Sequence, residues 1–452
     1  MTDKARIQSL AEFASRLSDR PLDPANPADA GWYIRDLHVQ ADLDGRERDP
    51  IARLARKIER AQGSQVWLFT GNIGSGKSTE LRRLRGLMKE QQHVALLADA
   101  SDYINLHQPV EISDFLISVS AAFAVEAGKL LHQDQIAAGY WERLRNLLLN
   151  TQISVNQVAV KSALPGLDTG IDLQAAIKLD PDFKLRLQQH LQAHLSTLRG
   201  EVEKMLEEIG QKIRDQYGDD CKIVLLFDSL ERLRGSGEAA DQVFSSLRRM
   251  FTQFHDMLRL PGIQVVYSIP QYLVRLEPQL YALFGDAAFC SLTSAHVFLK
   301  HSRNLDVAGV KVIHEIIGAR YPEWRTYLPE PALDRLIEAS GGDLRDLFRF
   351  LGGVLLELED NENADTAVTY VLSQVARTLT WITEPNLRRL QYVSQTKQLP
   401  RGSLEDMDAL VRDLETKRVL MYLNGEEWYD IHPLLREFVD SSPAVGDAHG
   451  TG

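Results

Sequence analysis

Short apolar runs alternate with helical hydrophobic patterns over residues 41–300. The runs are QVWLFT from Gln65, HVALLADA from His93, KIVLLF from Lys222 and GIQVVYS from Gly262. Helical spacing is expected from Lys77 to about Gln91, from Ile112 to Leu131 and from about Val243 to Met257. Strands that are apolar throughout and separated by helices are typical of a parallel sheet covered on both faces. The pattern therefore predicts an α/β domain.

The pattern changes between about residues 150 and 217. Two alternating runs, ISVNQVAV from Ile153 and IDLQAAIKL from Ile171, flank the turn-like segment ALPGLDTG. Alternation on both sides of a turn containing Pro and Gly predicts a small hairpin or a mobile insertion. Leucines at helical spacing return from Asp182 to about Tyr217. We expect this region to be an insertion in the α/β domain.

Strand-like patterns stop at about Lys300, and four helical segments follow. They are DVAGVKVIHEIIGARY, PALDRLIEAS, LRDLFRFLGGVLLELE and ADTAVTYVLSQVARTL. From about Glu384 the expected order is helix, helix, strand, turn, strand, helix. The turn Asn424-Gly425 lies between VLMYL and EWYDI, which is a strong hairpin signal. This order predicts a winged helix.

These patterns divide the chain into five segments. We expect an N-terminal helix and linker over 1–40, the α/β domain over 41–300, an all-α lid over 301–380, a winged helix over 381–440, and a disordered tail over 441–452.

A glycine-rich segment follows the first apolar run. GNIGSGKS, from Gly71 to Ser78, fits the pattern G-x-x-x-x-G-K-[ST] between a predicted strand and a predicted helix. Such a loop turns backbone N–H groups onto phosphate oxygens, its lysine reaches the β- and γ-phosphates, and its hydroxyl binds magnesium. The sequence therefore predicts a P-loop that binds ATP or ADP with Mg²⁺. Its binding residues are Gly71, Asn72, Gly74, Ser75, Gly76, Lys77, Ser78 and Thr79.

Two acids follow the third apolar run, in LLFDSLERL. Asp228 ends the strand, where a P-loop enzyme places the carboxylate of its magnesium site. Glu231 is the candidate base that activates the attacking water. The alternative for this pair is structural, because an Asp and a Glu three residues apart can form a helix capping box. Lys77, Asp228 and Glu231 are the predicted catalytic residues, and Ser78 and Asp228 the predicted metal ligands.

Three further positions are candidates for nucleotide contacts. Ser268 ends the fourth apolar run and is either a γ-phosphate sensor or a strand-end cap. Arg345, in the first turn of the helix after Gly341-Gly342-Asp343, either contacts the phosphates or is a surface charge. His432, in IHPLLREF, is in isolation more often structural than a ligand.

Composition narrows the class of protein. The 452 residues carry a formal net charge of −12, which argues against the nucleic-acid backbone as main partner. Two cysteines, Cys221 and Cys290, cannot form a disulfide framework. No apolar run of membrane-spanning length occurs and the N-terminus has no apolar signal core. We expect a cytoplasmic protein that does not contact membranes.

Taken in order, these segments resemble the STAND class of signal-transduction ATPases, relatives of the AAA+ ATPases. LDGRE from Leu43 is similar to the box that precedes the nucleotide domain in that class. The P-loop, LLFDSLERL, VVYSIP and SGGDLRDLFRFL resemble its Walker A, Walker B, first-sensor and second-sensor segments. IHPLLREF is similar to the Met-His-Asp box of the NB-ARC branch, whose histidine contacts the β-phosphate of ADP. The chain departs from the pattern at Asp44, where an apolar residue is usual, and at Pro433, which replaces the Asp.

The resemblance implies an AAA+/STAND-like P-loop NTPase fold with a helical lid and a winged helix. It implies a nucleotide-gated switch with slow Mg²⁺-dependent ATP hydrolysis in a bacterial defence or signalling system. Protein partners would supply sensor or effector, and nucleotide-dependent homo-oligomers are possible in that class. Two alternatives stay open: a DNA-binding initiator or loader ATPase, and a scaffold that binds ATP without turnover. The winged-helix region holds eleven acids and eight bases, counted over residues 381–440, which disfavours DNA.

Overall fold

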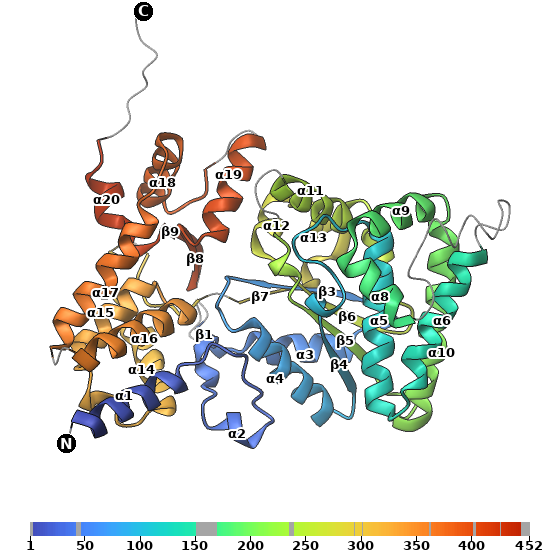
Figure 1. The fold of residues 1–452 in the computed structure, drawn as a ribbon, viewed down its shortest axis with the longest axis horizontal. Coiled ribbons are helices and arrows are strands. Elements are labelled where there is room, and N and C mark those ends of the chain that lie inside the picture. Colours follow the sequence, from blue (N-terminus) through green and yellow to red (C-terminus); the bar gives the residue numbers. More distant parts are fainter. Residues whose placement is uncertain are drawn as a thin grey trace, which may run out of the picture. The chain divides into compact units, whose positions relative to one another are not determined.

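The computed structural model describes residues 3–41, 47–150, 170–234, 239–292, 294–300, 302–360, 363–400, 404–424 and 426–443. Three predictions fall wholly or mostly outside these residues: the LDGRE box, the first strand of the hairpin in the insertion, and the tail. The chain forms two compact units (Figure 1). One comprises residues 51–70 and 80–290, which we call the sheet unit. The other comprises residues 1–50, 71–79 and 291–452, which we call the lid unit.

A five-stranded sheet has the order β4-β5-β6-β3-β7. Its strands are β3 (Val66–Gly71), β4 (Val94–Asp99), β5 (Ile223–Asp228), β6 (Gln264–Pro270) and β7 (Phe289–Leu292). The pairs β4–β5 and β5–β6 are parallel, and Asp99 is in register with Asp228. Every residue of β3, β5 and β6 is buried, as expected for strands covered on both faces. The predicted parallel α/β fold is confirmed, and β7 is the strand that the sequence analysis missed.

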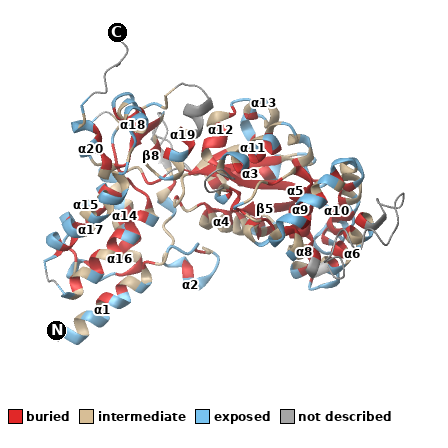
Figure 2. Ribbon diagram, turned by 45° about the horizontal axis from the view of Figure 1, so that its top comes forward, coloured by how far each residue is buried: buried red, intermediate tan, exposed pale blue. Residues whose placement is uncertain are grey.

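The helices of the sheet unit include the segments predicted over residues 77–91, 112–131, 182–217 and 243–257, together with others that were not predicted. They are α3 (Pro50–Arg60), α4 (Lys77–Glu90), α5 (Ile112–Leu131), α6 (Gln135–Asn150), α8 (Gly170–Leu179), α9 (Pro181–Gln192), α10 (Leu195–Tyr217), α11 (Ala239–Thr252), α12 (Gln271–Leu276) and α13 (Leu280–Phe284). Helices α6 and α10 pack on α5, and α5 packs on β4. Figure 2 shows buried residues along β5 and along α5.

The predicted second hairpin strand, IDLQAAIKL, is wrong. These residues form α8, in which Leu173 and Ile177 are both buried. Residues four apart lie on one face of a helix, so the segment buries its leucine and isoleucine against α6 and α9. The spacing of apolar residues in this run fits both a strand, with period 2, and a helix, with period 3.6. Packing against α6 and α9 favours the helix.

The lid unit is mostly helical. It contains α1 (Asp3–Arg16), α2 (Pro27–Ala30), β1 (Gln40–Ala41), β2 (Glu47–Arg48), α14 (Val307–Arg320), α15 (Glu330–Ser340), α16 (Leu344–Asp360), α17 (Ala364–Leu379), α18 (Glu384–Thr396), α19 (Leu404–Glu415), β8 (Val419–Asn424), β9 (Glu426–Ile431) and α20 (Arg436–Ser441). The order from α18 to α20 is the one predicted for a winged helix. Strands β8 and β9 form the predicted antiparallel hairpin, with Val419 opposite Ile431.

Alternate residues of β8 face two different hydrophobic cores. Leu420 and Tyr422 belong to the core of α14–α17, and Tyr422 stacks on Trp428 with ring centroids 4.4 Å apart. Val419 and Met421 belong to the smaller core formed with α18 and α20. Because side chains alternate across a strand, the hairpin joins the helical lid to the winged-helix elements.

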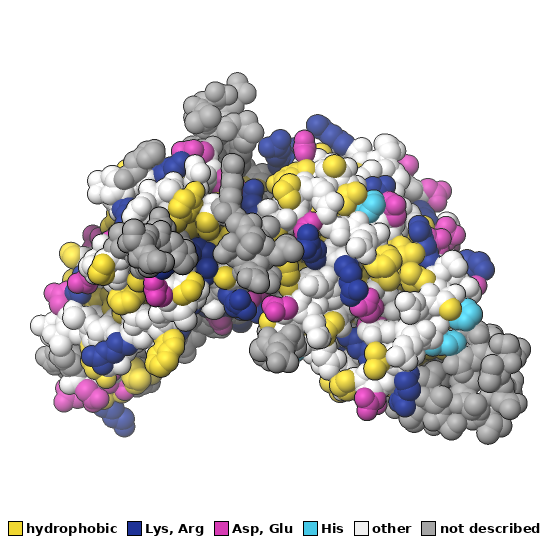
Figure 3. All heavy atoms as spheres, turned by 90° about the horizontal axis from the view of Figure 1, so that it is seen from above, with side chains coloured by type: hydrophobic (Ala, Val, Ile, Leu, Met, Phe, Trp, Pro, Cys, Tyr) yellow, Lys and Arg dark blue, Asp and Glu magenta, His cyan; other side chains and the backbone are white. Residues whose placement is uncertain are grey.

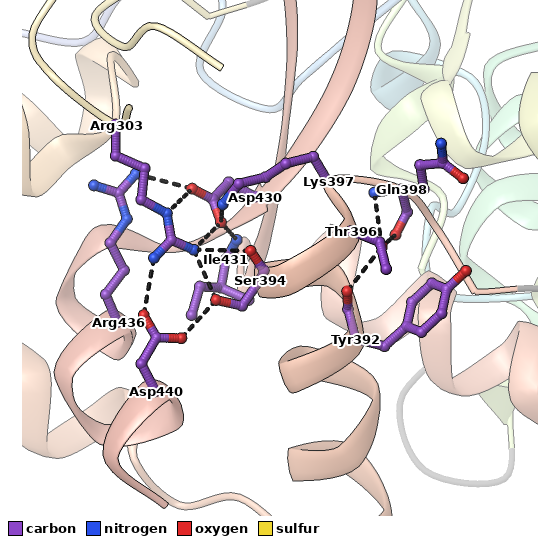
Figure 4. Close-up of polar contacts among 10 residues, drawn as sticks. All are labelled: Arg303, Tyr392, Ser394, Thr396, Lys397, Gln398, Asp430, Ile431, Arg436 and Asp440. Atoms are coloured by element: carbon purple, nitrogen blue, oxygen red, sulfur yellow. Dashed lines mark hydrogen bonds and ion pairs between the residues drawn. The ribbon is translucent and has the colours of Figure 1, made fainter. Parts of the chain in front are cut away.

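A buried ionic cluster reinforces the winged-helix elements (Figure 4). Asp430 is fully buried and accepts hydrogen bonds from Arg303 at 2.8 and 2.7 Å. Lys397 lies 2.8 Å and Arg436 3.2 Å from the same carboxylate. Arg303 also bonds Asp440 at 2.8 Å. We call these residues the Asp430 cluster, and its central carboxylate is compensated from three sides.

Candidate functional site: the P-loop and its neighbours

The P-loop has the backbone geometry that phosphate binding requires. Gly74 and Gly76 have φ of 85° and 87°, which orients successive N–H groups in a way that residues with a Cβ rarely allow. The Lys77 side chain is buried, and its ammonium donates to the carbonyls of Gly71 at 3.2 Å and Asn72 at 2.9 Å. The Ser75 hydroxyl is buried with no hydrogen-bond partner.

This geometry fits a nucleotide polyphosphate. A strand, a glycine loop and the N-terminus of α4 follow one another as predicted, and the loop holds a buried ammonium and an unpartnered hydroxyl. A helix N-terminus and a loop of N–H groups favour an anion. Gly71, Asn72, Gly74, Ser75, Gly76, Lys77, Ser78 and Thr79 are contiguous in this loop and helix start. Their contacts with nucleotide, and the magnesium role of Ser78, remain predictions.

The loop is held in place by other segments of the lid unit. The Asn72 amide donates to the Ser294 hydroxyl and to the Met421 carbonyl of β8, both at 3.0 Å. The Thr79 hydroxyl accepts a hydrogen bond from the Leu22 amide at 3.1 Å. The side chains of Asn72 and Thr79 therefore bond to protein, and the hairpin reaches the loop directly.

The turn Gly341–Asp343, which we call the GGD turn, also contacts the P-loop. A Cβ built on Gly74 would lie 2.7 Å from Asp343 Oδ1 and 2.8 Å from Oδ2, so the carboxylate packs against the loop backbone. Lys417 Nζ lies 2.9 Å from Asp343 Oδ1 and 3.0 Å from Asp346 Oδ2. Burial raises the pKa of Asp343, and the Lys417 ammonium partly opposes that shift.

Arg345 begins α16 as predicted but has another partner in this structure. Its guanidinium forms an ion pair with Asp19 at 3.0 Å, and the arginine side chain is 52% exposed. The predicted phosphate contact of Arg345 remains untested. Lys417, which the sequence analysis did not select, is the cation on the carboxylate beside the loop.

His432 is buried next to the same turn. Its Nδ1 accepts a hydrogen bond from the Leu434 amide at 3.2 Å and so caps the following helical turn. Burial lowers the pKa of His432 to about 4, and the strongest opposing influence is Asp346. The ring is therefore neutral at pH 7. Its local cap is the structural role considered above, while the phosphate contact stays a prediction.

In the sheet unit, Asp228 ends β5 beside a strained residue. Ser229 has a left-handed φ of 72°, which is uncommon for a residue with a Cβ. Its hydroxyl donates to Asp99 Oδ2 at 3.0 Å, and its amide donates to Asp228 Oδ1 at 2.8 Å. Asp99 thus holds the turn that fixes Asp228. The sequence analysis did not select Asp99. Asp99 stands at the end of an apolar run, as Asp228 does, so the same sequence signal could have identified it.

Glu231 and Ser268 were predicted separately, and the structure joins them. The Ser268 hydroxyl, fully buried at the end of β6, donates to Glu231 Oε2 at 2.6 Å. A carboxylate fixed by one hydrogen bond can still accept a proton on its other oxygen. The pair therefore suits a base held by a sensor serine, although the catalytic roles of both remain predictions.

Three other arginines of the chain have structural partners. Arg248 pairs with Glu277 and Arg249 with Glu111. Arg320 is buried and donates to the carbonyls of Arg16 and Ser18 at the end of α1.

Among the described residues, no group of three His, Cys, Asp or Glu side chains forms a metal site, and no helix is long and apolar enough to cross a membrane.

Comparison with known proteins gives distant structural likenesses. No family model matches the sequence, and no curated protein matches it either. Among solved structures, the chain is similar to the Aeropyrum pernix ORC2 protein in ADPNP–ADP complexes, with 14% identity and a TM-score of 0.37. That match covers 91% of this chain and 96% of the other. Cdc6p from Pyrobaculum aerophilum matches with 12% identity and a TM-score of 0.33, covering 91% and 97%. The STAND or NB-ARC subclass remains a prediction.

Proposed function

We propose that this chain is an AAA+-type ATPase in which bound nucleotide controls the lid unit. The observation that carries the proposal is the contact of the P-loop with both the GGD turn and the hairpin. The Asn72 amide donates a hydrogen bond to the backbone of β8. Gly74 packs against Asp343, and Asp343 forms an ion pair with Lys417, two residues before β8 begins. Phosphates on the loop would therefore interact differently with different positions of these elements. Only such differential contacts bias a conformational equilibrium.

The chain's own residues can support hydrolysis. Lys77 and the loop N–H groups would hold the phosphates, and Ser78 and Asp228 would hold magnesium, which neutralises phosphate charge when bound. Glu231 would accept a proton from water as the water oxygen bonds the γ-phosphorus and the bond to the bridging oxygen breaks. The products are ADP and inorganic phosphate. Ser268 would keep the Glu231 carboxylate oriented.

Nucleotide binding tests the first half of this proposal. We expect Lys77→Ala to lose affinity for fluorescently labelled ADP, because the buried ammonium is the loop's own cation. Lys89→Ala, at an exposed position of α4, is the matched control and should bind normally. Asp228→Ala should reduce the dependence of binding on magnesium. Unchanged ADP affinity in Lys77→Ala would refute the assignment of the loop.

Turnover tests the second half. Glu231→Gln keeps the shape and removes the base, so nucleotide binding should persist while phosphate release falls by about 10²–10⁴-fold. Phosphate release at the wild-type rate would return Glu231 to a structural role. No turnover in the wild-type protein, with binding intact, would favour the scaffold alternative.

The output of the switch is a separate question. A defence or signalling switch would engage a protein partner, whereas an initiator or loader, the type that the Orc/Cdc6 names suggest, would engage DNA. Acidic and basic side chains are interspersed on the face seen in Figure 3, and the winged-helix region is acidic overall. Binding to duplex DNA, measured at several salt concentrations with ADP and with an ATP analogue, distinguishes the two outputs. Tight, salt-sensitive binding lost on charge reversal at the exposed Arg388 would support the initiator type.

A further inference from the structure

The two carboxylate oxygens of Asp343 differ in their hydrogen bonding. One oxygen, Oδ1, accepts the Asp346 amide at 2.9 Å and caps α16, which is the ordinary role of such an aspartate. The other oxygen, Oδ2, is buried with no hydrogen-bond partner. The residue is 1% exposed, and its carboxylate faces the backbone of the phosphate loop. A buried carboxylate oxygen without a partner is costly, so a cap alone does not account for this placement.

Lys417 pairs with that carboxylate from a turn just after the end of α19. Its φ is 60°, in the left-handed region that residues with a Cβ rarely adopt. The side chain is 15% exposed and contacts both Asp343 and Asp346. Asp346 also pairs with Arg349 at 3.2 Å, so two carboxylates and two cations lie together here. The pair of Asp343 and Lys417 lies next to a loop whose geometry favours phosphate.

We propose that Lys417 is a phosphate-contacting residue that the winged-helix region contributes to the nucleotide site. Asp343 and Asp346 position its ammonium, and an incoming phosphate attracts Lys417 while it repels the Asp343 carboxylate. Lys417 thus takes the place that the sequence analysis gave to Arg345. Lys417 lies two residues before Val419, where β8 begins. A movement of Lys417 towards phosphate would therefore shift the first residues of the hairpin. This inference rests on the proposed nucleotide site.

A matched control exists within the same unit. Lys397 also has a φ of 60°, is 11% exposed along its side chain, and pairs with a buried aspartate, Asp430, at 2.8 Å. It belongs to the Asp430 cluster and not to the P-loop surroundings. Lys397→Met therefore reproduces the loss of a buried, left-handed, paired lysine. It does so without touching the proposed site.

The test is the affinity for labelled ADP and for a labelled, non-hydrolysable ATP analogue, with the melting temperature measured without nucleotide. We expect Lys417→Met to weaken binding of at least one of them by about 10- to 100-fold, since a charge-assisted bond to phosphate is lost. The Asp343→Asn/Lys417→Met double variant removes both charges of the pair, so it should fold and still bind about 10-fold more weakly. Lys397→Met should lower the melting temperature and leave both affinities unchanged.

A purely structural role for Lys417 gives different results. If the lysine only neutralises Asp343, the double variant regains wild-type affinity, and the proposal is overturned. Wild-type affinity in Lys417→Met overturns it directly. Binding lost in Lys77→Ala but retained in both Lys417 variants refutes this inference and leaves the proposed function standing. A wild-type protein that binds neither nucleotide contradicts the proposed function itself.

Discussion

Two buried aspartates of the lid unit, Asp430 and Asp343, differ in how fully their charges are compensated. Asp430 is surrounded by Arg303, Lys397 and Arg436 and lies at the centre of the Asp430 cluster. Asp343 has one lysine, a second acid nearby and an oxygen without a partner. A fully compensated charge stabilises one arrangement, while an incompletely compensated charge leaves room for an added ligand. We therefore expect the Asp430 cluster to contribute mainly to stability and the surroundings of Asp343 to contribute to the proposed nucleotide response.

The largest expected effect concerns Asp430. Asp430→Asn leaves three cations around a neutral amide, and breaking a buried pair in this way costs about 3–5 kcal/mol. We expect a marked fall in the free energy of unfolding, measured by denaturant titration, with ADP affinity retained under folding conditions. Asp343→Asn should cost clearly less stability. Equal losses in the two variants would contradict the distinction between the two aspartates.

Substitution of Gly74 tests the contact between Asp343 and the P-loop from the loop. Gly74→Ala places a Cβ 2.7 Å from Asp343 Oδ1 at a φ of 85°, which costs about 1–2 kcal/mol in backbone strain alone. We expect a larger loss of ADP affinity than of melting temperature. Combining it with Asp343→Ala removes the contact but not the strain, so affinity should recover in part. Complete recovery, or none, would show that the contact and the loop geometry are not both required.

Acid should destabilise the lid unit at His432, which lies beside the GGD turn. The pKa of His432 is about 4 in the folded protein, below its ordinary value of 6.5, so the unfolded chain binds more protons between these values. Stability therefore decreases as pH falls from about 6.5 towards 4, by up to about 1.4 kcal/mol per pH unit for one histidine. His432→Gln should make the decrease in melting temperature shallower over this range. An identical pH profile would show that His432 titrates normally.

The smallest expected effect is that of Asn72. Asn72→Ala removes the bonds to Ser294 and Met421, worth about 0.5–1.5 kcal/mol each. We expect a slight fall in melting temperature and a faster dissociation of ADP, measured by chase with unlabelled nucleotide. Ser294→Ala is the control, since it removes the first bond and keeps the link to β8. Equal dissociation rates in the two variants would mean that the hairpin link does not hold the loop.

Much of the fold could be predicted because its signals are local. Buried strands, the glycine loop and the hairpin each occupy a few consecutive residues whose pattern has one physical solution. The errors occurred where the deciding partner is distant: α8 satisfies two periodicities, and the four residues of β7 are too short and mixed to indicate a strand.

The site follows the same division. Lys77, Asp228 and Glu231 were selected because each stands in a short motif after a strand. Lys417 stands in no motif, and the role that we propose for it rests on its ion pair with Asp343, 74 residues earlier, which approaches the P-loop. No periodicity or spacing encodes a contact of this kind. The sequence did indicate the GGD turn, and Arg345, the charge selected there, pairs with Asp19 in this structure, so its predicted phosphate contact stays untested.

The first helix of the chain has a consequence for synthesis. Leu10 and Phe13 are fully buried, and Phe13 stacks on Tyr321 with ring centroids 4.5 Å apart. The helix packs on α16, which the ribosome makes more than 300 residues later. At about 5–20 residues per second, α1 waits on the order of 15–60 s with its apolar face uncovered. Until α16 has been made, Leu10 and Phe13 have no packing partner from that helix, so this apolar face is exposed to solvent on the growing chain.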